Sequence, residues 1–145
     1  MKVKDFVRQN FKVVFPDDEV LSIVKLMKDN DVGFVLVMDS NKVVGVLTAR
    51  DIVFGLANGM YMNEVAFKIM SAPVRSVSED DDVGLAISMM REFKCRRLVL
   101  TNVRGEVAGV VSIDDLVMND DVNGARKVLG EFFVNPGLDV DDFPL

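Results

Sequence analysis

The strongest constraint on the fold of this 145-residue chain is an internal repeat. Residues of the first half recur in the second half at a constant offset of 63 positions, as in Val14/Val77, Asp17/Asp80, Asp18/Asp81, Val20/Val83 and Met27/Met90. Beyond the turn at 102–105 the offset becomes 64. A single insertion confined to a turn is typical of a true tandem repeat, because loops tolerate added residues best. The pattern predicts two copies of one structural unit.

Each copy has the pattern strand, helix, strand, strand, helix. In the first copy the expected elements are a strand over 11–15, a helix over 20–27, strands over 34–38 and 43–47, and a helix ending near 58–59. In the second copy, Ser78–Asp81 is expected to cap the first helix. One helical layer covers only one face of a three-stranded sheet. We therefore expect an α+β fold in which two tandem β-α-β-β-α units pack through their sheets with pseudo-two-fold symmetry.

These patterns also set the expected boundaries. The first repeat is placed at 1–61 and the second at 62–129, with a linker at about 60–65. Residues 130–145 form an acidic C-terminal tail with four acidic and no basic side chains. The tail also carries the apolar residues Phe132, Phe133, Val134, Leu138 and Phe143. We expect these to dock onto the body of the protein or onto a neighbouring subunit, with a flexible tail as the alternative.

Composition narrows the possible functions. Most of the net charge of −6 lies in the tail, so the body is near neutral and nucleic acid is not expected as a partner. No apolar run reaches the roughly 18 residues of a membrane-spanning helix, so no membrane partner is expected. The lone Cys95 and the absence of His exclude an internal disulfide and a Cys/His zinc site. A cytoplasmic location is expected, with Cys95 as a small buried hydrophobe.

Two copies of one motif carry the candidate chemistry. Residues 45–51 read GVLTARD and residues 109–115 read GVVSIDD, and each stretch runs from an apolar strand into a helix. In one interpretation the Thr or Ser hydroxyl and the Asp three residues later only satisfy N–H groups of the first helical turn, as in a capping box. In the other, the motif binds a ligand. Glycine leaves room, the helix N-terminus attracts an anion, and the carboxylate accepts both hydroxyls of a ribose.

The paired motifs, together with the similar helix entries at 14–18 and 77–81, resemble the CBS domain, the module named after cystathionine β-synthase. The resemblance covers residues 1–122 and implies a tandem pair with two clefts that bind adenosyl ligands such as AMP, ADP, ATP or S-adenosylmethionine. Asp51 and Asp115 would hold ribose hydroxyls, and Thr48 and Ser112 would lie near the ribose or phosphate. The implied ligand-binding residues are Val14, Gly45, Thr48, Asp51, Arg96, Arg97, Gly109, Ser112 and Asp115.

Arg96 and Arg97 precede the strand over 98–100, where members of this family often carry basic phosphate contacts. A solvated pair at a strand start is an equally good interpretation, and side-chain alternation along a strand places only one of the two in a cleft. The resemblance pairs these arginines with Asp51. The positions aligned for the other cleft are Gly33 and Phe34, which carry no charge. We therefore expect the Asp51 cleft to bind a phosphorylated ligand more tightly.

A regulatory module that senses adenosyl ligands is the function that this resemblance implies. The alternative is a ligand-independent dimerisation scaffold in which both motifs are only caps. No enzyme is expected, because the chain has no His and no evident nucleophile–base pair, and neither a catalytic nor a metal site is assigned. No cofactor is expected beyond the regulatory nucleotide. The expected partners are a second copy, in a homodimer formed through the helices, and a separate effector protein.

Overall fold

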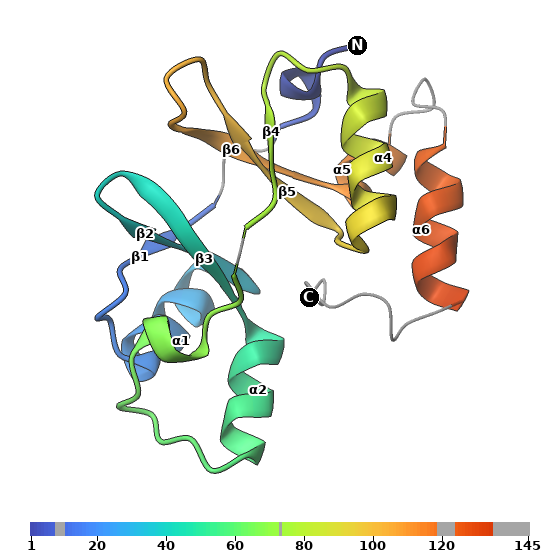
Figure 1. Ribbon diagram of the computed structural model, residues 1–145. Helices are drawn as coiled ribbons and strands as arrows, with labels where there is room; N and C mark the ends of the chain where they lie inside the picture. Colours follow the sequence, from blue (N-terminus) through green and yellow to red (C-terminus); the bar gives the residue numbers. More distant parts are fainter. Residues whose placement is uncertain (8–10, 73, 119–123, 135–145) are drawn as a thin grey trace. The chain divides into compact units, whose positions relative to one another are not determined.

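The computed structural model describes residues 1–7, 11–72, 74–118 and 124–134, with side chains described as far as Glu131. These residues form two compact units. One unit contains 11–72 and Val74, and the other contains 1–7 together with 75–118 and 124–134. Each unit holds one three-stranded sheet (Figure 1).

The first unit contains the first repeat. Its strand order is β1–β2–β3, with β1 parallel to β2 and β2 antiparallel to β3. Its elements are β1 (Val13–Val14), α1 (Val20–Asn30), β2 (Phe34–Asp39), β3 (Lys42–Thr48), α2 (Ala49–Ala57) and α3 (Ala66–Ile69). The predicted order of strands and helices is confirmed, although β1 is shorter than the predicted strand.

The second unit repeats this topology with the strand order β4–β5–β6. Its elements are the 3₁₀ helix η1 (Val3–Phe6), β4 (Ser76–Ser78), α4 (Val83–Phe93), β5 (Arg97–Thr101), β6 (Val107–Ser112), α5 (Ile113–Val117) and α6 (Ala125–Val134). The predicted α+β fold of two β-α-β-β-α units is confirmed. Their packing against each other through the sheets, and the repeat boundaries at 1–61 and 62–129, stay predictions.

Local structure shows one similarity between the repeats and one error of the prediction. Helices α1 and α4 both end at a residue in the left-handed region, Asp31 with φ 52° and Lys94 with φ 56°.

The N-cap of α4 is Asp82, whose side chain accepts the N–H of Gly84 at 2.8 Å. The predicted cap at Ser78–Asp81 is therefore wrong, because these residues form a separate turn before the helix begins.

The segment that precedes each repeat belongs to the unit of the other repeat. We call residues 1–7 and 62–71 the lead-in segments. The N–H of Val20, at the start of α1, donates to the carbonyl of Glu64 at 2.8 Å. The N–H of Val83, at the start of α4, donates to the carbonyl of Met1 at 2.9 Å. Each lead-in segment also buries one side chain completely, and these are Val3 and Ala66.

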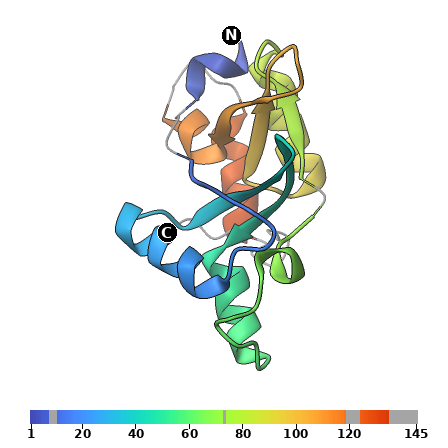
Figure 2. The same cartoon turned by 90° about the vertical axis from the view of Figure 1, so that its left-hand side faces the viewer.

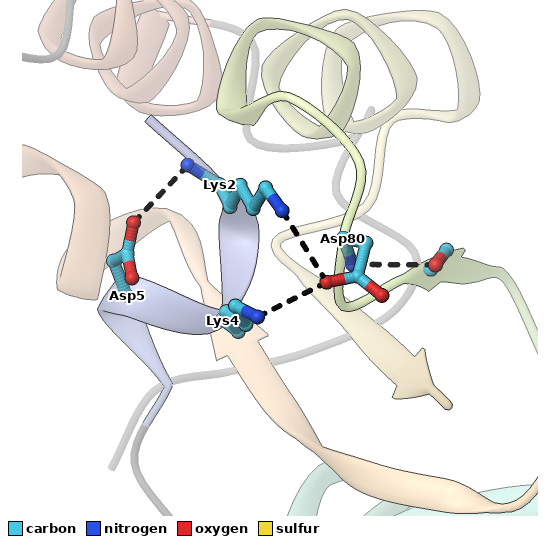
Figure 3. Close-up of polar contacts among 5 residues, drawn as sticks. Lys2, Lys4, Asp5 and Asp80 are labelled. Carbon is cyan, nitrogen blue, oxygen red and sulfur yellow. Dashed lines mark hydrogen bonds and ion pairs between the residues drawn. The ribbon is translucent and has the colours of Figure 1, made fainter. Parts of the chain in front are cut away.

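Ion pairs help to attach the first lead-in segment to the turn before α4 (Figure 3). Nζ of Lys4 lies 3.1 Å from Oδ1 of Asp80, and Nζ of Lys2 lies 3.7 Å from the same oxygen. The hydrogen bond between Lys4 and Asp80 raises the pKa of Lys4 and lowers the pKa of Asp80. Both shifts favour the charged forms of the two side chains.

Helix α6 covers α4 and α5 of the second repeat (Figure 1 and Figure 2). Ala125 is fully buried and Val128 nearly so, and both belong to the core of that unit, as does the buried Cys95. The predicted burial of Cys95 is confirmed, whereas α6 was not predicted. Residues 135–145 lie outside the described residues, so the docking of the tail stays a prediction. None of the helices in the described ranges is long and apolar enough to cross a membrane.

Candidate ligand-binding site

Both motif acids take part in a reciprocal capping box at the start of a helix. The N–H of Asp51 donates to Oγ1 of Thr48 at 3.1 Å, and the N–H of Thr48 donates to Oδ2 of Asp51 at 3.0 Å. Ser112 and Asp115 form the same two bonds, each at 3.1 Å. The predicted capping bonds are therefore present in both copies of the motif. A carboxylate has about four acceptor positions, so a cap that uses Oδ2 is compatible with ligand binding as well.

The strand pairing places the motif glycines, and in the first unit also Val14, on edge strands directly beside the central strand of the sheet. In the first unit, Val14 and Gly45 lie on either side of Val37. In the second unit, Gly109 pairs with Leu100 in the same way. Both glycines are buried. Each glycine is therefore a buried residue in the middle part of the strand that leads into the capping box.

Ser71 is a neighbour of the motif acid that the sequence prediction missed. Its Oγ lies 3.4 Å from Oδ1 and 3.5 Å from Oδ2 of Asp51. Its backbone exchanges hydrogen bonds with Val46 of β3, at 2.8 and 3.0 Å, which fixes the second lead-in segment beside this strand. The contact results from the exchange of lead-in segments between the units, which no pattern in the sequence indicates.

The two candidate arginines have different environments. Arg96 is only 8% exposed. Its Nη2 lies 3.4 Å from Oδ1 of Asp114, and its carbonyl accepts the N–H of Ile113 at 2.8 Å, so it supports the start of α5. Arg97 is half-buried in β5 and is the cross-strand partner of Ser112. Cross-strand partners project from the same face of a sheet, so Arg97 lies beside the motif of its own repeat.

The predicted site residues fall into two sets, one in each unit. The first set is Val14, Gly45, Thr48 and Asp51, and the second is Arg96, Arg97, Gly109, Ser112 and Asp115. The structure brings the motif residues together within each set, whereas a cleft shared by the two sets stays a prediction. In the part of the chain that the structure describes, no group of three or more Cys, Asp and Glu side chains could hold a metal ion.

Comparison with known proteins identifies relatives of the whole two-repeat arrangement. The chain is 35% identical over 116 residues to an uncharacterized 17.7 kDa protein of Acidianus ambivalens, a match that covers 79% of this chain and 70% of that protein. It resembles the structure of a CBS domain protein from Pyrobaculum aerophilum in complex with AMP, with a TM-score of 0.74, 23% identity, and coverage of 92% of this chain and 99% of that one.

A second solved structure, a CBS domain pair in complex with 5′-methylthioadenosine and S-adenosyl-L-methionine, matches with a TM-score of 0.71 and 20% identity, covering 81% of this chain and 94% of that one. At these identities the two structural matches show the fold. The CBS domain family model matches the chain twice, over residues 3–58 and again over 65–120. The chain therefore belongs to the CBS domain family, as a tandem pair.

Proposed function

We propose that the chain is a regulatory module that binds adenosyl ligands in clefts between its two CBS repeats. The observation that carries the proposal is the placement of the motif acids. Asp51 and Asp115 are each half-buried at a helix N-terminus, directly after a strand with a buried glycine. The complexes of similar proteins with AMP and with S-adenosyl-L-methionine support the choice of ligand class. AMP, ADP, ATP and S-adenosylmethionine share the ribose that a carboxylate recognises.

A carboxylate suits a ribose because it accepts hydrogen bonds from both vicinal hydroxyls. Hydrogen bonds to a charged group contribute about 1.5–3 kcal/mol each. A phosphate near a helix N-terminus gains about 0.3–1 kcal/mol more. Thr48 and Ser112 are the N-caps of α2 and α5, so a ligand bound there would meet a hydroxyl and helix N–H groups together.

The two clefts are proposed to differ in their affinity for phosphorylated ligands. We assign the phosphate contact to Arg97, because Arg96 is only 8% exposed whereas Arg97 is half-buried and therefore more accessible to a ligand. If Arg97 serves the acid of the other repeat, as in the family, the Asp51 cleft binds phosphorylated ligands more tightly. The pairing of Arg97 with Ser112 supports a competing assignment, in which Arg97 serves Asp115. One arginine–phosphate contact changes the affinity by about tenfold to a hundredfold.

Ligand binding is proposed to act on another protein, because no catalytic residue is assigned in this chain. Binding would change the affinity of the module for an effector or for a second copy of itself. Such a coupling is reciprocal, so the effector would change the affinity for the nucleotide by the same factor. We place the module in the cytoplasm, where a cysteine outside any disulfide, such as Cys95, stays reduced.

Isothermal titration calorimetry with AMP tests the role of the acids. Asp51→Asn keeps an oxygen that can accept the N–H of Thr48 but removes the charge. It is expected to weaken AMP binding at least about tenfold while the thermal unfolding temperature stays close to that of the wild type. Asp115→Asn is the matched variant for the second cleft. Asp29→Asn, on the exposed side of α1, is the control and should change nothing.

A thermal-shift panel with AMP, ADP, ATP and S-adenosylmethionine identifies the ligand. A ligand at 100 times its Kd stabilises the fold by about 2.7 kcal/mol, which is readily measured. If none of the four shifts the unfolding temperature, the adenosyl proposal is wrong and the ligand-independent dimerisation scaffold is favoured.

A double-mutant cycle tests which acid Arg97 serves. Arg97→Ala is combined in turn with Asp51→Asn and with Asp115→Asn, and the affinity for the bound nucleotide is measured. The acid whose substitution is energetically coupled to that of Arg97 belongs to the same cleft.

A further inference from the structure

The helical side of the first repeat carries an open apolar groove. It lies between α1 and α2 and has a volume of about 330 Å³. The residues that matter for its chemistry are Val24, Met27, Ile52 and Val53 on its walls, with the charged Lys28 and Asp31 beside them. Val53 is 60% exposed although it faces this apolar surface. Exposed apolar surface on a helical face commonly marks an interaction site.

In the second repeat, the chain itself covers the equivalent surface with a helix. The repeat places Ile87 and Met90 of α4, and Leu116 and Val117 of α5, at the positions of the four groove-wall residues. Helix α6 contacts both α4 and α5 and adds the buried Ala125 and Val128 to their core. As a result Val117 is half-buried, whereas its counterpart in the first repeat is exposed.

A charged contact accompanies the packing of α6. Nη2 of Arg91 on α4 lies 3.1 Å from Oε1 of Glu131 on α6. The residue of the first repeat at the position of Arg91 is Lys28, which lines the open groove. The first repeat thus has apolar groove walls and a cation at the positions that contact α6 in the second repeat. Among the described residues of the first unit, no helix covers this groove in the way that α6 covers the second repeat.

We propose that the groove between α1 and α2 is a docking site for a helix of a partner protein, and that this helix resembles α6. It would present small or branched apolar residues at the spacing of Ala125, Val128 and Leu129, and an acidic residue at the position of Glu131. One repeat supplies its own helix, and the other receives one from outside. The groove would connect the module to the protein that it regulates, but the proposal does not depend on which ligand the module binds.

The probe is a fluorescein-labelled peptide with the sequence of residues 124–134, GARKVLGEFFV, titrated with the full chain and followed by fluorescence anisotropy. The tethered α6 has an effective concentration in the millimolar range, so the free peptide does not displace it and reports on the open groove. We expect saturable binding below about 1 mM protein, since the short peptide must also form its helix on binding.

Two substitutions locate the bound peptide. Val53→Glu places a charge in the apolar groove and should weaken binding at least about tenfold. Lys28→Glu replaces attraction to the peptide's acid by repulsion and should weaken binding about threefold to tenfold. A peptide carrying Glu131→Lys should bind the Lys28→Glu protein better than the unchanged peptide does, as expected for a direct charge pair. Lys25→Glu, an exposed change on the same helix, is the control.

Three results would overturn the proposal. One is the absence of peptide binding. Another is binding that neither Val53→Glu nor Lys28→Glu changes, because the peptide would then adhere elsewhere. In the last, sedimentation shows a dimer of the wild type and a monomer of Val53→Glu, because the groove would then hold a second copy of the chain. Both substituted side chains are exposed, so the variants should unfold at nearly the wild-type temperature, and a circular dichroism melt checks this.

Discussion

The side chain of Met70 occupies the space that a Cβ atom on Gly45 would fill. Val7 lies in the same way against Gly109. Both neighbours come from lead-in segments, and both glycines belong to the duplicated motif. The absence of a side chain in the motif is therefore explained first by the close approach of the chain itself. A ligand contact at either glycine stays a prediction.

Alanine at the two motif glycines is expected to destabilise the fold unequally. The β-branched side chain of Val7 is restricted about χ1, whereas that of Met70 is flexible and can move aside more easily. We expect Gly109→Ala to lower the free energy of unfolding by about 2–3 kcal/mol and Gly45→Ala by about 1 kcal/mol, within the range for overpacked cores. Urea denaturation of the two variants measures the difference.

A second substitution checks the cause of that difference. Adding Val7→Ala to Gly109→Ala removes the clash and should recover part of the lost stability, although Val7→Ala alone costs some packing. If the double variant is as unstable as the sum of the two single variants, the close approach of Val7 is not the reason for glycine at position 109.

The repeat and the periodicity were sufficient to predict the fold because they act locally. Helix α1 follows from apolar residues at helical spacing, and strand β2 follows from a short continuous run of apolar residues. The exchange of lead-in segments could not be predicted, because contacts such as Ser71 with Asp51 join segments whose own patterns do not specify a partner. Alternation along a strand predicted that Arg96 and Arg97 would differ. It did not predict that Arg96 pairs with Asp114.

Helix α6 was missed although the sequence contained a usable signal. Ala125, Val128 and Leu129 have the spacing of one helical face, and Gly124 precedes them. The acidic composition of the segment that follows favoured the interpretation as a tail, and Gly130 weakened the helical pattern. The sequence therefore did not predict that a helix covers the second repeat. It also did not predict the contrast between this covered surface and the groove of the first repeat.

Removal of a capping hydroxyl should destabilise both repeats, and the first repeat by more than the second. Ser112→Ala deletes the acceptor for the N–H of Asp115 and should lower the free energy of unfolding by about 1 kcal/mol, within the range of about 0.5–2 kcal/mol for N-caps. Thr48→Ala removes a buried methyl group as well, so its effect should be larger. Thr48→Ser keeps the hydroxyl and is the matched control. An unchanged urea midpoint for Ser112→Ala would contradict the cap.

The contact between Lys4 and Asp80 should hold the first lead-in segment only within a pH window. The pKa of Asp80 is lowered in the folded state, so its contribution is present above the ordinary value of 3.8 and is lost as the pH falls through the lowered value. The pKa of Lys4 is raised, so its contribution is present below 10.5 and is lost as the pH rises through the raised value. The contact should therefore be intact at neutral pH.

Hydrogen exchange of the Val3 and Lys4 amides measures this contact locally, because both amides donate to the turn before α4. Asp80→Asn should lower their protection factors at pH 6, and the difference from the wild type should shrink toward pH 3. Both side chains are exposed, so salt at about 1 M should also reduce the difference. Equal protection in the two proteins at pH 6 and low salt would mean that the ion pair does not hold the segment.

Alanine at Gly130, within α6, and at Gly124, just before α6, should change the free energy of unfolding in opposite directions. A Cβ at Gly130 meets nothing within 4 Å and lies inside the helix, so Gly130→Ala should raise the free energy of unfolding by about 0.5–1 kcal/mol. Gly124, just before the helix, has a φ of 89°, which an alanine adopts only with strain. Gly124→Ala should therefore lower the free energy of unfolding by about 1–2 kcal/mol. Urea denaturation at a constant m-value compares the two. Because α6 is part of the core of the second unit, both changes should appear in its unfolding transition; if neither alters the urea midpoint, α6 does not contribute to that core.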